Sequence, residues 1–468
     1  FFNDTATTEI YTLPYTTLFR SGLSQEDLNM KPSSVPRGSR FFIAWPNVRR
    51  RSIMMNKKAG KMNMAMLVLL TAFFMLWTIG TVNVFSATFA EDMSSGSAFG
   101  HLIRQLVFSV IGLIPAMYVF KRDYRDLKKH TAWLYAVTVL LLLAVLAAGV
   151  TVNGAKRWIG FAGFTFQPSE LAKLTVILCT ATILAPMIEA GKRIEFLVPW
   201  KTGRGTSALQ RLTVYPQRCL ALTLVLAVPV VVQPDAGTAI IIMALPILML
   251  WISGARVMHV KYPLLAAAVL AGLCLLAAPY RMNRIVAWLD PWGYEKTLGY
   301  QTVQGLIAIG SGGIMGQGLG EGISKFSYLP EAHTDFAFAV LAQEWGLRGS
   351  LVMLLLFSAI IYYGCICAIN CKDPFGRLLA FGVTMYFGVQ GFINIGMVSG
   401  MLPVVGVPLP FISYGGTSLI VNMVAAGILL NICKSNRREA QRQAPAGTLR
   451  ELKSMRDETR SVFRPGRS

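Results

Sequence analysis

The chain has 468 residues, of which 54% are hydrophobic and 14% charged, and its formal net charge is +21 at pH 7. Soluble chains are typically about 25% charged, so this composition excludes an ordinary cytosolic enzyme and predicts a helical membrane protein. A positive excess of this size is typical of proteins that bind nucleic acid or an anionic membrane surface, and the positions of the charges decide between the two.

Residues 1–21 lack the basic start and apolar core of a signal peptide. They resemble translated sequencing-adapter sequence, so we treat them as non-native and exclude them from the fold. Residues 1–63 as a whole are polar and basic, and we expect them to form a disordered N-terminal segment. The apolar run that follows is expected to act as a retained signal anchor.

Apolar runs, most of them close to the length that crosses about 30 Å of hydrocarbon, recur between residues 64 and 433. They predict an all-α, polytopic membrane domain of ten transmembrane helices, followed by a basic cytoplasmic tail at 434–468. The ten runs lie near residues 64–89, 102–120, 132–152, 169–186, 219–233, 238–254, 262–279, 336–369, 377–399 and 411–433. The run at 336–369 is too long for one straight span, and Gly346 divides it, which predicts a half-helix at the outer surface.

Lysine and arginine concentrate in alternate loops, and cytoplasmic loops normally carry this excess. The basic stretches 1–63, 121–130, 187–218 and 434–468 all fall on one side if ten helices cross the membrane with both termini in the cytoplasm. The positive charge is then explained by topology, and we expect no nucleic acid as a partner. The long Gly-rich loop 280–335 falls on the outer side, and loops of this length are usually functional.

Lys156, Arg157 and Trp158 lie in an outer loop, where the charge rule does not expect cations. One interpretation is an anchor to lipid headgroups, with the tryptophan at the depth of the membrane interface. The other is a cationic contact for the phosphates of a lipid-linked substrate.

Several polar residues interrupt the apolar runs. Glu170 and Lys173 are three residues apart on one predicted helix, and we expect an intramembrane ion pair because charges inside a span need partners. Asp235 has two interpretations, a helix cap or Asx turn and a carboxylate that lines a polar cavity. Ser413 lies in the Pro- and Gly-rich segment 400–418, where broken helix must be buried in protein or line a cavity.

The outer loop contains three further candidate substrate contacts, Arg281, Gln301 and Lys325. Its glycine run at 310–320 lacks the Lys-Ser/Thr end of a P-loop and follows no predicted strand, so the pattern gives little support to a nucleotide site. We expect these glycines to allow tight re-entrant turns over a substrate site.

Glu331, His333 and Asp335 gather three titratable groups just before the apolar run at 336–369. Asp335 alone would fit a helix N-cap. The grouping also fits a general base or a metal-assisted site, with Glu331 and His333 in contact with substrate. The 7 cysteines and 4 histidines show no metal-ligand spacing, so we assign no metal ligands, and a divalent cation (Mg²⁺ or Mn²⁺) stays open as a cofactor.

Several blocks, in this order, resemble the SEDS family of FtsW, RodA and SpoVE. They are NGAKRWIGF with FQPSELAKL, QPDAGTA, RIVAWLDPWGYEKTLGYQ, GQGLGEGISKFSYLPEAHTDFAFAV and GMLPVVGVPLPFISYGGTS. LDPW…GYQ and KFSYLPEAHTDF are more similar to FtsW or SpoVE than to RodA. The stretches Gln343–Gly346 and Tyr294–Lys296 depart from the family pattern without touching Asp335.

The resemblance implies a peptidoglycan glycosyltransferase of the bacterial cytoplasmic membrane, which polymerises lipid II into β-1,4 glycan strands at the outer face for septal wall synthesis in cell division. It implies a class B penicillin-binding protein, divisome proteins and membrane lipids as partners. The family's essential aspartate falls on Asp335, and its intramembrane glutamate and lysine fall on Glu170 and Lys173.

These residues suggest a mechanism in which Asp335 deprotonates the 4-hydroxyl of the acceptor sugar. Lys156, Arg157, Arg281 or Lys325 would neutralise the leaving diphosphate. A lipid II flippase is the alternative class, and a scaffold that activates the penicillin-binding protein is a third. The span interiors are almost free of charge, which favours a site on the outer side over a path across the membrane.

Overall fold

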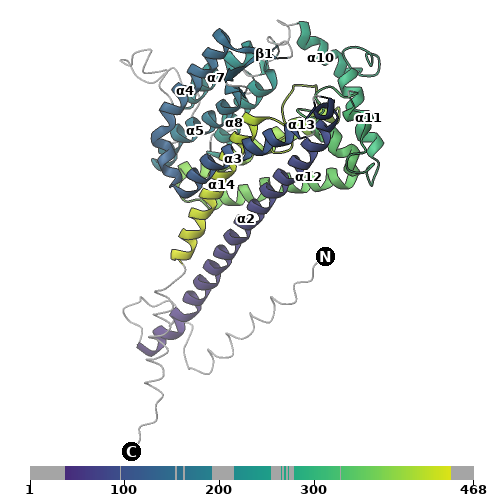
Figure 1. The fold of residues 1–468 in the computed structure, drawn as a ribbon. Coiled ribbons are helices and arrows are strands. Elements are labelled where there is room, and N and C mark those ends of the chain that lie inside the picture. The colour runs from purple at the N-terminus through teal and green to yellow at the C-terminus, as the bar shows by residue number, and fades with distance from the viewer. Residues whose placement is uncertain are drawn as a thin grey trace, which may run out of the picture. The chain divides into compact units, whose positions relative to one another are not determined.

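In the computed structural model of the chain (Figure 1), the described residues are 37–94, 96–97, 99–152, 155–161, 164–191, 215–254, 265, 268–269, 272, 279–326 and 328–443. The chain divides into two compact units. One consists of Lys61–Arg438, and the other consists of Phe1–Gly60 together with Glu439–Ser468. All residues of the candidate site belong to the first unit.

Seven helices in the described part are long and apolar enough to cross a membrane, and two shorter apolar helices accompany them. The long helices are α2 (Arg37–Ser94), α3 (Gly100–Lys121), α4 (Leu127–Ala148), α5 (Pro168–Glu189), α12 (Ala337–Asn370), α13 (Pro374–Val398) and α14 (Gly416–Gln443); the shorter ones are α7 (Tyr215–Val232) and α8 (Ala236–Ile252). Each lies where the sequence predicts a span, so the polytopic helical architecture is confirmed. The predicted span at 262–279 lies largely outside the described residues.

Two helices continue beyond the predicted spans. α2 begins at Arg37, inside the segment 1–63, and α14 ends at Gln443, inside the tail that begins at 434. Helix formation does not require apolar residues, and lysine, arginine and alanine, which occur in both extensions, are all good helix formers.

A small sheet departs from the all-helical prediction. β1 (Val150–Val152), β2 (Ala155–Phe161) and β3 (Phe164–Phe166) form an antiparallel sheet in that order, between α4 and α5. The strands are rich in β-branched and aromatic residues, which suit a pleated surface. The sequence between β1 and β2 is Asn-Gly, the strongest short hairpin signal. The prediction from sequence rests on the charged residues that follow it and includes no hairpin.

The predicted outer loop 280–335 contains secondary structure of its own. It holds α10 (Pro279–Leu289), α11 (Tyr300–Gly312) and the short 3₁₀ helix η3 (Ile323–Lys325). The glycines serve close packing against α12: a Cβ on Gly312 would collide with the backbone of Ala342, and one on Gly316 with that of Glu344. Glycine is therefore required here because two backbones touch.

α12 is broken at Gly346, as the sequence predicts. Gly346 has φ 68 and ψ −163, which no helix contains. Carbonyl groups freed near the break are satisfied by the glycine-rich loop, since Gln317 N donates to Gln343 O at 3.0 Å and Gly318 N donates to Glu344 O at 3.1 Å. Broken helix at membrane depth is tolerated when protein satisfies its backbone in this way.

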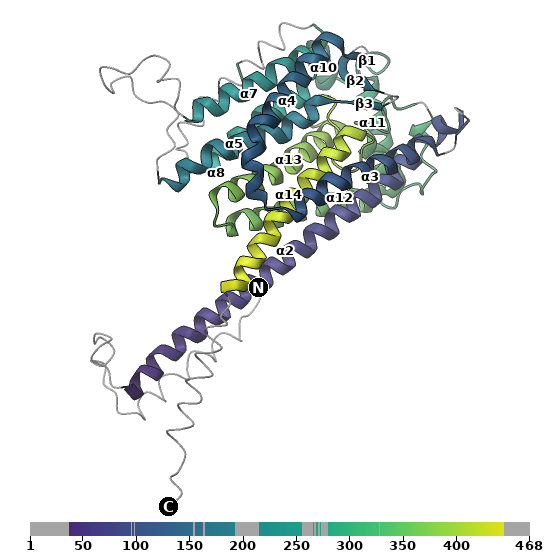
Figure 2. The ribbon, with the colours of Figure 1, turned by 60° about the vertical axis from the view of Figure 1, so that its left-hand side comes forward.

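α5 lies among the other helices. It packs against α4, α7, α8 and α13, and Figure 2 shows it beside α4, α8 and α13. In its most apolar window 72% of the residues are buried, compared with 22% for α3 and for α4. Charged side chains on α5 therefore face protein, and they need partners from the neighbouring helices.

Gly346→Ala is expected to destabilise the protein, because alanine is strained at this positive φ and its Cβ would collide with the backbone of Gly316. The free energy of unfolding should fall by at least about 1–3 kcal/mol. Gly310→Ala is the matched control, because Gly310 is helical and a Cβ there meets nothing within 4 Å. Thermal unfolding of purified protein in detergent checks this, and equal midpoints for the two variants would contradict it.

Candidate active site

An ion pair on α5 lies at the centre of a network of polar contacts. Glu170 Oε1 lies 2.7 Å from Lys173 Nζ, and the side chains are 1% and 0% exposed. Glu170 occupies the first turn of α5, where the helix dipole favours an acid. Burying either ion alone would cost of the order of several kcal/mol, so each charge requires the other. The structure thus contains the pair that the three-residue spacing predicts.

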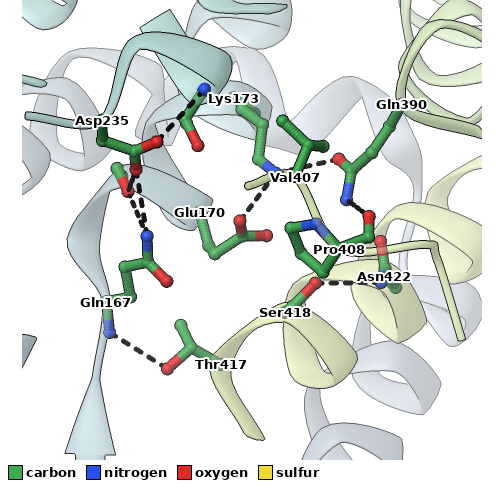
Figure 3. A network of polar contacts seen from close by, with 12 residues as sticks. Gln167, Glu170, Lys173, Asp235, Gln390, Val407, Pro408, Thr417, Ser418 and Asn422 are labelled. Carbon is green, nitrogen blue, oxygen red and sulfur yellow. Dashed lines mark hydrogen bonds and ion pairs between the residues drawn. The ribbon is translucent and has the colours of Figure 1, made fainter. Parts of the chain in front are cut away.

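The pair is linked to the Pro-rich segment between α13 and α14 through one amide. Lys173 Nζ donates to Gln390 Oε1 at 2.8 Å, and Gln390 Nε2 donates to Pro408 O at 2.9 Å (Figure 3). The ring of Tyr386 lies 5.4 Å from Lys173 Nζ and gives the ammonium a further partner on α13. The position of residue 408 therefore depends on the charge buried on α5.

Asp235 joins the starts of α5 and α8. Its carboxylate accepts hydrogen bonds from Gln167 Nε2 and Ser169 Oγ, both at 3.1 Å, and from the backbone N–H of Thr238 at 3.3 Å (Figure 3). The last of these makes Asp235 the N-cap of α8, and the residue is 1% exposed. Of the two interpretations of Asp235, the structure supports the helix cap.

Asn394 links the same Pro-rich segment to the loop that carries Asp335. It lies one turn after Gln390 on α13, and its Nδ2 donates to Val407 O and to Asp335 O, each at 2.7 Å. The side-chain oxygen Oδ2 of Asp335 faces Gly406, where an added Cβ would lie 3.6 Å from it. Asp335 is therefore held by its backbone against α13, with its carboxylate beside the segment between α13 and α14.

Asp335 and Glu331 share one hydroxyl donor. Thr334 Oγ1 lies 2.5 Å from Glu331 Oε2 and 3.3 Å from Asp335 Oδ1, and it has a single proton to donate. Burial, and after it the charge of Glu331, raise the pKa of the Asp335 carboxyl to about 7, although hydrogen bonding from Thr334 and the positive charge of Arg284 act in the opposite direction. Glu331 itself has φ 55, a strained conformation that is typical of functional sites.

Three of the predicted cationic contacts have structural partners. Lys156 Nζ donates to two carbonyl groups at the C-terminal end of α4, both at 2.9 Å, and Arg157 donates to two carbonyl groups just before α8. Lys325 Nζ lies 3.1 Å from the carboxylate of Glu344, and the side chains are 2% and 0% exposed. Arg281 lies on α10, and its side chain is outside the described part of the structure.

Arg284 is a cation near Asp335 that the sequence interpretation did not select. Its charge lowers the pKa of the Asp335 carboxyl, and its Nη1 donates to Val404 O at 2.9 Å. It lies one turn after Arg281 on α10, a strongly amphipathic helix. That spacing was the one available signal, because two arginines three residues apart share a helix face.

The remaining predicted contacts have separate positions. Gln301 Nε2 approaches Pro330 O at 3.5 Å, next to the Asp335 loop. Trp158 is half-buried on β2, and the hydroxyl of Ser413 accepts a hydrogen bond from Leu409 N at 2.8 Å. Glu331, His333 and Gln301 are thus gathered at Asp335. Trp158 lies on the sheet, and Ser413 lies in the Pro-rich segment, next to Tyr414, whose backbone N–H donates to His333 O.

A cluster of imidazole and carboxylate groups lies beside the Asp335 loop. His101 Nδ1 lies 2.6 Å from Asp92 Oδ1, and His333 Nδ1 lies 3.9 Å from Glu91 Oε2. Tyr414 packs its ring against both histidines, with centroids 5.0 Å and 5.8 Å away, and its backbone N–H donates to His333 O at 2.8 Å. Burial lowers the pKa of His333, which favours the neutral imidazole.

Comparisons with known proteins agree on one family. Residues 66–438 match the FtsW, RodA and SpoVE family, described as "Cell cycle protein". The chain is 39% identical over 374 residues to a probable peptidoglycan glycosyltransferase FtsW of Geobacter sp. (strain M18), covering 78% of this chain and 96% of that one. It is 36% identical over 376 residues to the stage V sporulation protein E of Bacillus subtilis (strain 168), covering 80% and 97%.

Solved structures with the same fold include two related proteins. One is a chain of a peptidoglycan synthase complex, described for its coordination of polymerization and crosslinking; it is 28% identical, with a TM-score of 0.61 and coverage of 79% of this chain and 97% of that one. The other is the rod shape determining protein RodA of Thermus thermophilus, which is 26% identical, with a TM-score of 0.55 and coverage of 79% and 96%. The arrangement of helices described above is therefore shared with a RodA protein.

Lys173→Met is expected to be strongly destabilising, because it leaves the Glu170 carboxylate buried without its counter-ion. Losing one partner of a buried pair typically costs about 3–5 kcal/mol. The double variant Glu170→Gln/Lys173→Met should recover part of this loss, because no buried charge remains. Lys129→Met, which breaks the fully exposed pair with Asp126, is the matched control and should change little. Unfolding in detergent measures all four proteins, and equal losses for the two lysine variants would contradict the expectation.

Proposed function

The chain belongs to the FtsW, RodA and SpoVE family and is a peptidoglycan glycosyltransferase, and we propose that it polymerises lipid II with Asp335 as the general base. The observation that carries this proposal is the position of Asp335. Its backbone is fixed by Asn394, while its carboxylate lies half-buried beside Gly406, next to a second carboxylate and a cation. A base must be held in place and must also remain within reach of the substrate.

The proposed reaction is a direct displacement at the anomeric carbon of the donor sugar. Asp335 accepts the proton of the acceptor 4-hydroxyl as that oxygen forms a bond to the anomeric carbon, and the bond to the lipid diphosphate breaks. Attack from the face opposite the leaving group inverts the α-linked donor to a β-1,4 linkage. A diphosphate leaves readily, so one carboxylate base can suffice without a separate proton donor.

We assign neutralisation of the leaving diphosphate to Arg284. Its charge acts on Asp335, so it lies on the same side of the reacting groups, and guanidinium groups bind phosphate oxygens well. Lys156, Arg157 and Lys325 donate to carbonyl or carboxylate groups of the protein, as Arg284 does to Val404 O. What distinguishes Arg284 is that its charge acts on Asp335. Arg281 lies one turn away on α10 and is a second candidate.

The proposed orientation places Asp335 at the outer membrane surface. The basic loop between α3 and α4 would face the cytoplasm under the positive-inside rule, as would both termini. An outer site would allow a class B penicillin-binding protein to cross-link new strands where they emerge. The likeness to a chain of a peptidoglycan synthase complex supports such a partner. Septal synthesis in cell division, with divisome proteins as further partners, fits the FtsW relatives.

Asp335→Asn should abolish polymerisation, because the amide keeps the shape of the carboxyl but cannot accept a proton at neutral pH. The turnover number should fall by about 10²–10⁴, the usual contribution of a general base. Glycan strands formed from lipid II by purified protein, with and without a penicillin-binding partner, provide the measurement. Asp126→Asn, an exposed carboxylate at the turn before α4, is the control. Normal turnover by Asp335→Asn would exclude the base role, whereas a wild type that forms no strands with or without the partner would favour the flippase or the scaffold.

Asn394→Leu should lower turnover with little effect on the Michaelis constant, because it releases Asp335 and residue 407 without removing a group that contacts substrate. A displacement of about 1 Å at a catalytic group can cost 10²-fold in rate. Steady-state kinetics on lipid II separate the two parameters. A rise in the Michaelis constant at constant turnover would instead assign Asn394 to substrate binding.

A further inference from the structure

Three side chains from three distant segments converge beside the Asp335 loop. Glu91 comes from the end of α2, His101 from the start of α3 and His333 from the loop before α12. One ligand atom from each lies within 4.8 Å of the other two. We propose that Glu91, His101 and His333 form a binding site for a divalent transition-metal cation, of which Zn²⁺ and Mn²⁺ are the chemical representatives.

The separations suit one ion between these atoms. Ligands at about 2.0–2.2 Å from one tetrahedral metal lie about 3.3–3.6 Å apart, so three atoms that now lie within 4.8 Å of one another must approach by at most about 1.5 Å, which side-chain rotation can supply. The 3.9 Å between His333 Nδ1 and Glu91 Oε2 is too long for a hydrogen bond and fits two ligands of a common ion. Imidazole nitrogen with carboxylate oxygen is a ligand set typical of zinc and manganese.

The second observation is the carboxylate behind His101. Asp92 Oδ1 lies 2.6 Å from His101 Nδ1, and Asp92 Oδ2 accepts a hydrogen bond from the backbone N–H of His101 at 3.0 Å. Asp92 is only 3% exposed, so the ring is held firmly. With Nδ1 donating to Asp92, Nε2 carries the lone pair that a metal requires. Histidine ligands in metal sites almost always donate their other ring N–H to a carboxylate, a backbone carbonyl or water, and Asp92 is such a carboxylate.

The surroundings of His333 favour a cation. The carboxylate of Glu91 lies 3.9 Å from its Nδ1, and Glu331 lies two residues before it in the same loop. The backbone carbonyl of His333 is fixed by Tyr414, whose ring also packs against both histidines. The cluster therefore combines an excess of carboxylate with two fixed imidazoles.

A bound ion would connect the turn between α2 and α3 to the loop that carries Asp335. Glu91 and His101 lie on opposite sides of that turn, and His333 lies two residues before Asp335. Three ligands leave positions for water or for an oxygen of another molecule, as in sites that are open to solvent. Glu91 is itself exposed, so an ion can enter from outside.

The test is binding of Zn²⁺ to the full chain, purified in detergent and stripped with EDTA, measured by isothermal titration calorimetry. We expect the wild type to bind one equivalent that His101→Ala abolishes. Asp92→Asn should weaken binding by about 10–100-fold, the usual effect of removing a carboxylate behind a histidine ligand. Glu91→Gln, at an exposed position where folding should not suffer, should also weaken binding at least tenfold. Bound Zn²⁺ should raise the unfolding midpoint of the wild type and not that of His101→Ala.

His130→Ala is the matched control, because His130 lies at the start of α4, away from this cluster, and this variant should bind like the wild type. The proposal is overturned if the wild type binds no Zn²⁺, or if Glu91→Gln and His101→Ala bind it as tightly as the wild type. Mn²⁺ competition then identifies the preferred ion. No lipid substrate is present, so the outcome is independent of the role proposed for Asp335.

Discussion

The Glu170–Lys173 pair is buried among helices where neither ion can be hydrated, so each charge must find its partners within the protein. This need for partners determines how the site is assembled. The ammonium takes Gln390 as its second partner, and the other end of that amide holds Pro408. One turn further along α13, the side-chain amide of Asn394 donates hydrogen bonds to the carbonyl groups of Val407 and Asp335. Hydrogen bonds, joined through the covalent link between residues 407 and 408, therefore connect a charge on α5 to the backbone of Asp335.

The backbone around the site is irregular, and the side chains of α13 satisfy it. The segment between α13 and α14 has no helix to pair its carbonyl groups, yet two of them accept hydrogen bonds from buried amides. Glu331 is strained in the loop that carries Asp335, and Thr334 bridges its carboxylate to that of Asp335. Strain of this kind persists only where surrounding contacts fix the chain. The site thus has a partly buried carboxylate on a backbone that hydrogen bonds hold in place.

Local patterns predicted much of this structure. Hydropathy located the helices, the length of one run with Gly346 predicted the break in α12, and the three-residue spacing predicted the Glu170–Lys173 pair. Each of these depends on residues that are close in sequence. The β-sheet before α5 was not predicted because two of its three strands are only three residues long, which is too short for an alternating pattern to show.

Contacts between distant segments could not be predicted in the same way. Lys325 appeared to be a substrate contact, but Glu344 neutralises it in the core, a pairing that only the tertiary fold creates. Asn394 and Arg284 belong to no sequence motif. They matter because α13 and α10 place them near Asp335. The ligands Glu91, His101 and His333 escaped a search for metal spacing because they come from three segments.

The connection from the buried ion pair to the catalytic loop can be measured directly by hydrogen–deuterium exchange. Backbone amides in 331–336, including those of Thr334 and Phe336 that donate to Glu331 O, should exchange faster in Lys173→Met than in the wild type. Exchange at the C-terminal end of α3 (Gly100–Lys121), at the other end of that helix from His101, should be unchanged. Unchanged exchange at 331–336 in a variant whose α5 is clearly destabilised would contradict the account.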